Sequence, residues 1–365
     1  MAEITVVIPV YNQEKYLKDC LDNIINQSFT DIEIICINDG STDASPEMLE
    51  EYALKDERIR IINQENQGLA RTRNRGIEEA HGKYVYFMDS DDYLELTALE
   101  QLYDLSMQYD PDFIMFKLYN FNEETHEPII DDYYTMPYLR KRVGRNLFNY
   151  DDVEDFALKL AVNAPGNFYK RSFIEDIRFP EGLLFEDNVF FTMALFKADK
   201  ILFYDEFLYH RRVRENSLSQ SLSLDTIEIT NILLDLCEEY GHTRHKRELY
   251  YRIFNNIYNV FDNAPEEYKE DVFQKIKDEY RRYSAKWLED DFFNNKLNPR
   301  YRNMFHSALR SDNHVEFALR VESYDMDDKI RKLERENGKL IGKINKLKRE
   351  NNNIKSTKGY RIFKK

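Results

Sequence analysis

The sequence predicts an α/β fold, with a mostly parallel sheet and helices on both faces, followed by a helical region and a C-terminal coiled-coil helix. Strand and helix patterns alternate over the first 120 residues, patterns after Leu224 are helical, and a heptad repeat begins at Ile330. Repeated strand–helix–strand units imply parallel strands with covering crossover helices. We therefore expect an α/β domain over 1–220, a helical domain over 221–322, and a coiled-coil helix with a basic tail over 323–365.

The α/β part begins with five apolar runs of strand character, separated by four runs whose apolar residues recur at helical spacing. The strand-like runs are ITVVIPV, IEIICIND, RIRIIN, YVYFMDS and DFIMFKLY. The helical runs are EKYLKDCLDNIINQ, SPEMLEEYALK, LARTRNRGIEEA and TALEQLYDLSMQY. Ligands of such folds bind beyond the carboxyl ends of the strands. Three polar clusters follow strands there, so we expect one shared site from Tyr11-Asn12, Asn38-Asp39-Gly40 and Asp89 to Asp92.

The C-terminal segment has a heptad pattern in which apolar residues or asparagines recur in steps of three and four. These positions are Ile330, Leu333, Asn337, Leu340, Ile344, Leu347, Asn351 and Ile354. Two asparagines at a positions favour a parallel dimer in one register. The alternative is a single solvated helix, because only about three and a half heptads are present.

Charge is distributed unevenly along the chain. The net charge is −15, but residues 329–365 carry +11, so residues 1–328 carry −26. An acidic body argues against nucleic acid as its partner, since phosphate binding needs a basic face.

Three cysteines without pairing or metal-site spacing indicate reduced thiols.

The ends of the chain bear on its location. No apolar run approaches the roughly 20 residues of a membrane span, and the first strand starts too early for a signal peptide, so we expect a cytoplasmic protein. The last residues, KSTKGYRIFKK, mix basic and aromatic side chains. That mixture suits peripheral contact with an anionic membrane surface on the inner face. The alternative is a solubilising end on a coiled coil.

Asp89, Asp91 and Asp92 follow an aromatic-rich strand. Clustered carboxylates stay ionised together only if a cation or hydrogen bonds offset their repulsion. Mg²⁺ or Mn²⁺ takes oxygen ligands, commonly one or two carboxylates plus substrate phosphates. The D-x-D pattern therefore suits a metal held against a diphosphate. The alternative is that Asp91 or Asp92 caps a helix beginning at about Leu94.

Five motifs occur in an order and at spacings that resemble family 2 glycosyltransferases of the Rossmann-like GT-A fold. They are VVIPVYNQEKYL, INDGSTD, NQGLARTRNRGIEEAHGKYVYFMDSDDYL, FPEGLLFEDNVF and RVRENSLS, within residues 3–220. The resemblance is closest to bacterial and archaeal enzymes that build capsule, exopolysaccharide or cell-wall glycans. It implies metal-dependent, inverting transfer from a nucleoside diphosphate sugar, such as a UDP-sugar, to a hydroxyl of a glycan or lipid-linked acceptor.

The resemblance implies donor-binding roles for residues in these motifs. Pro9 ends the first strand, and Tyr11 would lie flat against the base. Asp39 would accept a hydrogen bond from the base imide, which favours uracil; the alternative is a cap or Asx-turn ahead of the next helix. Arg73 would lie near base and ribose, and Asp89 on the ribose side.

The resemblance also implies contacts to the diphosphate. Asp91 would ligate the metal, Mn²⁺ or Mg²⁺, and His210 would complete its shell. The alternative for His210 is a structural role, since it lies among aromatic residues. Arg212 and Arg214 match a loop that folds over the diphosphate, where guanidinium groups suit phosphate oxygens.

The motif FED, which contains Glu186 and Asp187, matches the catalytic acidic pair of that family. Asp187 would deprotonate the acceptor hydroxyl as the diphosphate leaves, and Glu186 would position it or contact the acceptor. A single base with in-line attack gives inversion, whereas double displacement would need a carboxylate nucleophile. The alternative is that both carboxylates only favour the first turn of a helix over 187–197.

Two other classes of protein fit the sequence less well than a transferase. A non-catalytic scaffold could keep this fold and oligomerise through the coiled coil, but it would not need Asp89, Asp91, Asp187 and Arg212 together. A nucleotidyltransferase would need a glycine-rich phosphate loop after the first strand, and PVYNQEKY has none.

Overall fold

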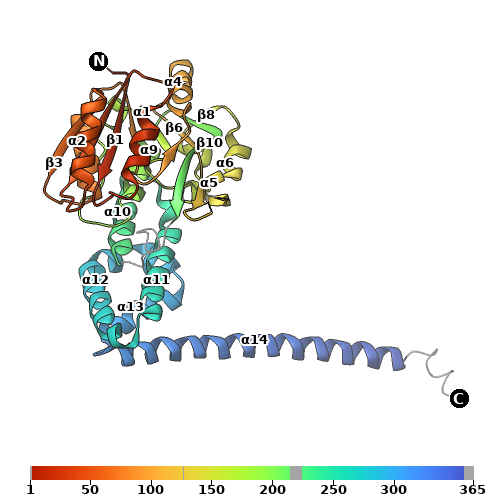
Figure 1. The fold of residues 1–365 in the computed structure, drawn as a ribbon. Coiled ribbons are helices and arrows are strands. Elements are labelled where there is room, and N and C mark those ends of the chain that lie inside the picture. Colours follow the sequence, from red (N-terminus) through yellow and green to blue (C-terminus); the bar gives the residue numbers. More distant parts are fainter. Residues whose placement is uncertain (1, 126, 214–223, 357–365) are drawn as a thin grey trace. The chain divides into compact units, whose positions relative to one another are not determined.

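The computed structural model describes residues 2–125, 127–213 and 224–356 (Figure 1). It divides into two compact units, Met1–Leu249 and Tyr250–Lys365. Helix α10 (Asp225–Glu239) lies within the first of them. The domain limits expected at residues 220 and 322 stay predictions.

The first unit is built on one mixed sheet with strand order β3-β2-β1-β4-β9-β6-β10-β5. Its parallel part consists of β1 (Ile4–Val10), β2 (Ile32–Asp39), β3 (Ile59–Gln64) and β4 (Tyr84–Phe87). β9 (Asn167–Lys170) runs antiparallel between β4 and β6 (Phe113–Asn122), and β10 (Ile201–Val213) runs parallel to β6. The short strands are β5 (Tyr93–Leu94), β7 (Pro128–Ile129) and β8 (Leu147–Phe148). The predicted α/β fold is confirmed.

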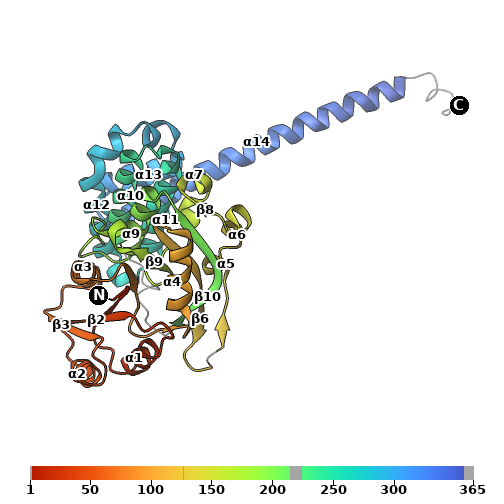
Figure 2. The same cartoon turned by 90° about the horizontal axis from the view of Figure 1, so that it is seen from above.

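Helices cover both faces of the parallel part (Figure 2). α1 (Leu17–Ile25), α2 (Ser45–Lys55) and α4 (Ala98–Tyr109) pack on the face that carries Ile4, Val6, Ile8 and Val10 of β1. α3 (Leu69–Glu79) packs on the opposite face, where a Cβ added to Gly76 would lie 2.2 Å from Val7. Only glycine allows α3 to approach β1 this closely, because a side chain there would overlap the valine. This approach fixes the position of Arg73 on the same helix.

Strand β1 continues one residue beyond Pro9, which was expected to end it, and closes at Val10. Proline lacks an amide hydrogen, so it is tolerated in a strand only where no ladder bond is needed from it. β4 pairs with β1 only from Ile4 to Val7, which leaves Pro9 outside that ladder. The site-facing end of β1 is therefore Val10 rather than Pro9.

Short helices connect the later strands of the first unit. They are α5 (Asp132–Thr135), α6 (Pro137–Val143), α7 (Tyr150–Val153) and α8 (Arg171–Ile174). α9 (Asp187–Lys197) is longer and begins at the predicted residue. Its Phe190 contacts Phe87 of β4 and Phe179 in the preceding loop, with ring centroids 6.0 and 4.0 Å away. These rings anchor the start of α9 at the sheet.

The second unit is helical and has its own aromatic core. Its helices are α11 (Lys246–Asn263, which starts in the first unit), α12 (Lys269–Glu289), α13 (Pro299–Arg310) and α14 (His314–Ser356). Trp287 is fully buried, and the rings around it are Tyr250, Phe254, Tyr280, Tyr283, Phe293 and Phe305. α14 begins at His314 because the side chain of Asn313 accepts a hydrogen bond from Glu316 N at 3.0 Å. No helix in the described ranges is long and apolar enough to cross a membrane.

Candidate active site

Arg73 of α3 joins two acidic segments that are far apart in the sequence. Its Nη2 donates to Asp89 Oδ1 at 2.8 Å, and its Nη1 donates to Glu186 Oε1 at 2.6 Å. Arg73 is 4% exposed, and its guanidinium lies 5.5 Å from the Phe179 ring. Burial opposes its charge, but Asp89 and Glu186 raise the pKa of Arg73 above its usual value. The turn after β4 and the start of α9 therefore meet at one buried cation.

Asp187 lies beside this ion-paired group. Its Oδ1 accepts a hydrogen bond from Asn188 Nδ2 at 3.1 Å. Burial, followed by the charge of Glu186, raises the pKa of Asp187 to about 7, although Arg73 acts in the opposite direction. A carboxyl group with this pKa can take up or release a proton near neutral pH.

The chain enters the acidic pair through a strained residue. Phe185 has φ of 64°, a left-handed conformation that is rare for a bulky side chain. Such strain persists only where the surroundings hold it in place. Here Glu186 is held by Arg73, and Asn188 Nδ2 donates to Phe185 O at 3.1 Å. The strained residue therefore leads directly into Glu186 and Asp187 at the start of α9, where Glu186 is bonded by Arg73.

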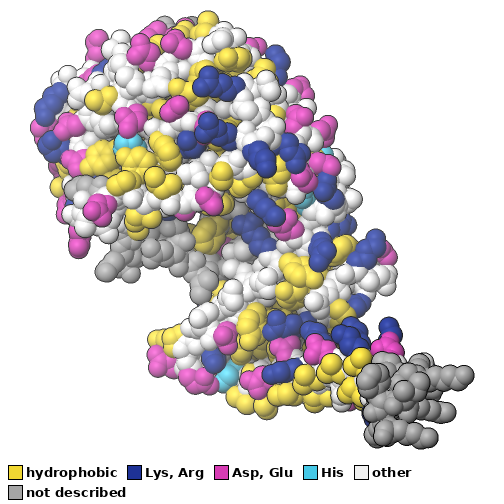
Figure 3. All heavy atoms as spheres, turned by 90° about the vertical axis from the view of Figure 1, so that its right-hand side faces the viewer, with side chains coloured by type: hydrophobic (Ala, Val, Ile, Leu, Met, Phe, Trp, Pro, Cys, Tyr) yellow, Lys and Arg dark blue, Asp and Glu magenta, His cyan; other side chains and the backbone are white. Residues whose placement is uncertain are grey.

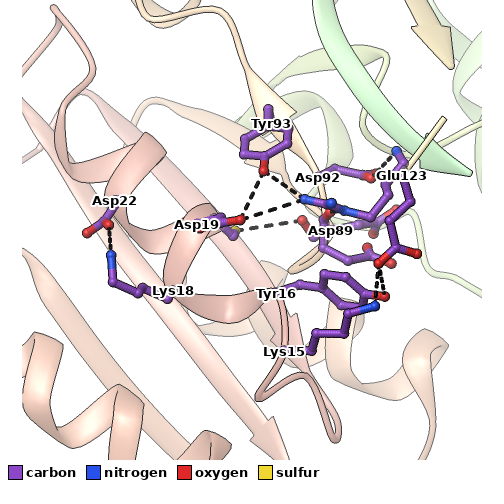
Figure 4. A network of polar contacts seen from close by, with 12 residues as sticks. Lys15, Tyr16, Lys18, Asp19, Asp22, Asp89, Asp92, Tyr93 and Glu123 are labelled. Carbon is purple, nitrogen blue, oxygen red and sulfur yellow. Dashed lines mark hydrogen bonds and ion pairs between the residues drawn. The ribbon is translucent and has the colours of Figure 1, made fainter. Parts of the chain in front are cut away.

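Asp92 is a structural member of the acidic cluster. Its Oδ2 accepts from Tyr209 Oη at 2.6 Å, and its Oδ1 accepts from Arg212 N at 2.7 Å. Burial and the charges of Asp91 and Asp89 raise the pKa of Asp92 well above its usual value. Asp92 therefore ties the turn after β4 to β10 (Figure 4).

The capping alternative for the acidic cluster is wrong. Residues 93 and 94 form strand β5, which pairs with β10, and α4 begins only at Ala98. Neither Asp91 nor Asp92 precedes a helix at the place where a cap would be needed.

Arg212 has its guanidinium engaged within the protein. Nε donates to the carbonyl oxygen of Asp91 at 2.9 Å, and Nη2 donates to Tyr93 Oη at 2.8 Å. The group also lies 4.8 Å from the Tyr16 ring and 5.1 Å from the Phe121 ring. Tyr93 Oη in turn donates to Asp19 Oδ2 at 3.0 Å (Figure 4). Contact of Arg212 with a diphosphate stays a prediction, and Arg214 lies outside the described residues.

Arg211 was not among the predicted site residues, yet it is close to the acidic cluster. Its Nη1 donates to Tyr134 Oη at 2.8 Å. Burial opposes its charge, but Tyr134, Asp92 and Asp89 raise the pKa of Arg211. Alternation along a strand places residues 209 and 211 on one face and 210 and 212 on the other. Because Tyr209 bonds Asp92, the same alternation assigns Arg211 to the carboxylate side.

The two predicted metal ligands, His210 and Asp91, belong to β10 and to the turn after β4. His210 Nε2 lies 2.8 Å from Glu95 Oε1, and its ring stacks on Tyr119 with centroids 4.4 Å apart. Asp91 is partly exposed. Among the residues described, no three His, Cys, Asp or Glu side chains are grouped to hold a metal ion. The carboxylates of Asp89 and Asp91 are oxygen donors of the kind that Mn²⁺ or Mg²⁺ prefers, and metal binding at this turn stays a prediction.

Residues expected at the nucleotide base lie at the ends of β1 and β2. Tyr11 is 49% exposed directly after β1. Asp39 is buried, and its Oδ1 accepts from Gln67 N and Gln64 Nε2, both at 2.8 Å. Its Oδ2 accepts from Gly68 N at 2.9 Å. Asp39 thus shapes the turn before α3, while its role toward a base stays a prediction.

Sequence comparison assigns the family. Residues 5–175 match the sequence profile described as Glycosyl transferase family 2. The chain is 34% identical over 256 residues to putative glycosyltransferase EpsH of Bacillus subtilis, covering 68% of this chain and 71% of that protein. With the fold and the acidic site described above, this chain belongs to glycosyltransferase family 2 and is a glycosyltransferase.

Individual relatives give the extent of the similarity. The chain is 39% identical to glycosyltransferase GlyA of Streptococcus pneumoniae over 222 residues, which cover 60% of this chain and 32% of GlyA. It therefore spans about a third of that longer protein. The crystal structure of Staphylococcus aureus TarS 1–349 in complex with UDP-GlcNAc has the same fold, with a TM-score of 0.64. The sequences are 20% identical, and the match covers 90% of this chain and 92% of that one.

Proposed function

We propose that this chain is a metal-dependent, inverting glycosyltransferase that moves a sugar from a UDP-sugar to a hydroxyl of a glycan or lipid-linked acceptor in cell-surface polysaccharide synthesis. The observation that carries the proposal is the double ion pair of buried Arg73 with Asp89 and Glu186. It connects the predicted donor-binding turn with the predicted catalytic pair. A UDP-sugar is further supported by the donor bound to TarS.

Asp187 is assigned the role of general base. Its pKa of about 7 allows it to be ionised in a large fraction of molecules at neutral pH and still to accept a proton from a sugar hydroxyl. Glu186 is the positioning residue, because its carboxylate is held by Arg73 and its charge raises the pKa of Asp187. A single base of this kind suits in-line attack and inversion at the anomeric carbon.

Asp91, with Asp89 nearby in the chain, would hold Mn²⁺ or Mg²⁺. When bound, the cation would neutralise charge that develops on the departing diphosphate. Arg211 is a further candidate for the diphosphate, because its guanidinium is close enough to Asp92 and Asp89 for their charges to raise its pKa. His210 is the weaker candidate for the metal, since Glu95 and Tyr119 account for its contacts.

The wider setting of the reaction rests on the motif resemblance. That resemblance favours a bacterial or archaeal surface glycan as the acceptor. Contact of the basic end with the inner face of the membrane stays a prediction that falls on residues 357–365, outside the described residues.

The test is a panel of UDP-, GDP- and dTDP-sugars, with Mn²⁺, measured by thermal shift and by release of nucleoside diphosphate. We expect stabilisation and slow donor hydrolysis with a UDP-sugar, both abolished by chelation. Asp187→Asn should keep the thermal shift and lose hydrolysis. Asp176→Asn, an exposed carboxylate paired with Lys197, is the matched control. Equal hydrolysis by wild type and Asp187→Asn would remove the assignment of the base.

A further inference from the structure

The distal part of α14 is exposed on all sides within the described chain. The first turns of this helix bury Phe317 and Val321 in the second unit. From Met326 onward, every side chain with a described position, up to Asn353, is exposed. Figure 3 shows hydrophobic side chains at the surface of the described residues, among Lys, Arg, Asp and Glu side chains. A helix surrounded by water is marginally stable, and Gly338 and Gly342 weaken this one further.

Six large apolar side chains of this part form one stripe, called here the α14 seam, and a further one, Ile341, is 51% exposed and lies beside it. The seam residues are each between 47% and 63% exposed; they are Met326, Ile330, Leu333, Leu340, Ile344 and Leu347. With Asn337 included, they follow alternating steps of four and three, which defines a and d positions of a heptad repeat. Both glycines fall at b and f positions, away from the seam, where an added Cβ would meet nothing within 4 Å.

We propose that two copies of this chain associate in parallel through the α14 seam as a two-stranded coiled coil. Ile330 and Ile344 at a positions, with leucine at three of the four d positions, are the combination that favours two strands. At about 1.5 Å per residue, the paired part from Met326 to Asn351 would be about 39 Å long. This inference is independent of the donor and the acceptor of the transferase.

The asparagines select the parallel orientation. In a parallel pair, Asn337 and Asn351 each face the same residue of the other copy, so their amides bond each other. In an antiparallel pair, a positions face d positions, and every d position of the seam is methionine or leucine. Each asparagine would then be buried without a partner, which disfavours that orientation.

Flanking charges do not change this conclusion. In the parallel register, Lys329 of one copy faces Glu334 of the other, which is favourable. Lys343 faces Lys348, which is unfavourable. The apolar seam and the asparagines therefore decide the pairing.

The association is tested on the full chain by sedimentation equilibrium at micromolar concentration. We expect a dimer for wild type, a monomer for Leu340→Glu, and a dimer for the matched control Asn345→Glu, which adds the same charge at a b position. A cooperative thermal unfolding transition checks that each variant stays folded. A monomeric wild type, or the same change in both variants, would overturn the proposal.

Orientation is tested by oxidising the Ile330→Cys variant. The three native cysteines are buried, so a new disulfide reports the introduced thiol. Parallel strands place the two introduced thiols together, and a cross-linked dimer is expected, while Asn345→Cys at an outward position should not cross-link. A dimer of Ile330→Cys that persists without forming this disulfide would refute the parallel arrangement.

Discussion

Replacement of Arg73 by methionine tests the proposed link between the two acidic segments. Methionine keeps most of the side-chain volume but removes the cation, so Asp89 and Glu186 lose the donor they share. Removing one partner of a buried ion pair destabilises a protein by about 3–5 kcal/mol. Because the Asp89 side chain is 33% exposed and regains water, we expect the lower end, about 3 kcal/mol.

The same substitution should move the pH dependence of the reaction. The positive charge of Arg73 favours the ionised form of Asp187, so its loss raises the pKa of Asp187 above about 7. If the rise is about one pKa unit, the ionised fraction at pH 7 falls roughly fivefold. The acid limb of the pH–rate profile should therefore shift upward, with activity recovering at higher pH.

The assay combines urea denaturation with pH profiles of donor hydrolysis. Arg71→Met is the matched control, since Arg71 lies on the same helix and pairs with Glu78 at the surface, at 3.0 Å. Its loss should change stability by about 0–1 kcal/mol and leave the profile in place. Arg73→Lys should be intermediate, because an ammonium keeps the charge but lacks the two separate nitrogens that reach Asp89 and Glu186. An unshifted acid limb in Arg73→Met would refute the coupling to Asp187.

Three further outcomes are expected. Asp187→Asn should be more stable than wild type at pH 8, as measured by thermal melting. Folding raises the pKa of the Asp187 carboxyl from 3.8 to about 7, so the wild-type protein loses stability as the pH rises from 3.8 to about 7, and asparagine avoids this loss. A lower Tm for Asp187→Asn at pH 8 would contradict this. Asp91→Asn should need about tenfold more Mn²⁺ for half-maximal activity, with an unchanged Tm. Asp92→Ala should lower the free energy of unfolding in urea by about 2–3 kcal/mol, because Tyr209 Oη and Arg212 N lose their acceptor. The reverse pattern would exchange the roles of the two aspartates. Gly76→Ala should lower the free energy of unfolding by about 1–3 kcal/mol or more, because the added methyl group overlaps Val7 of β1. Gly338→Ala, where nothing is overlapped, should instead raise the helix content. Equal, small effects of both variants on urea unfolding would show that α3 can shift away from β1.

The sequence predicted those parts of the fold that local pattern controls. β1, β2 and α9 have the predicted limits, apart from the place of Pro9 within β1, because apolar runs bounded by polar residues define them. β5 was not predicted, since the two residues Tyr93 and Leu94 form a strand only by pairing with β10. Contacts between distant segments carry no local signal.

The sequence predicted most residues of the site, but it did not predict which of them contact one another. Motif resemblance selected Arg73, Asp89 and Glu186, which the fold brings together. It did not select Arg211, because the face of β10 that meets Asp92 depends on the register with β6, which shifts between Tyr204 and Tyr209. It also gave no indication of the strained φ at Phe185.

Asp39 holds the backbone amides of Gln67 and Gly68, immediately before the helix that carries Arg73. Asp39 therefore holds the start of α3, and Arg73 ties the second turn of the same helix to Glu186. Hydrogen exchange at the amides of Gln67 and Gly68 would measure how firmly this carboxylate holds the helix start.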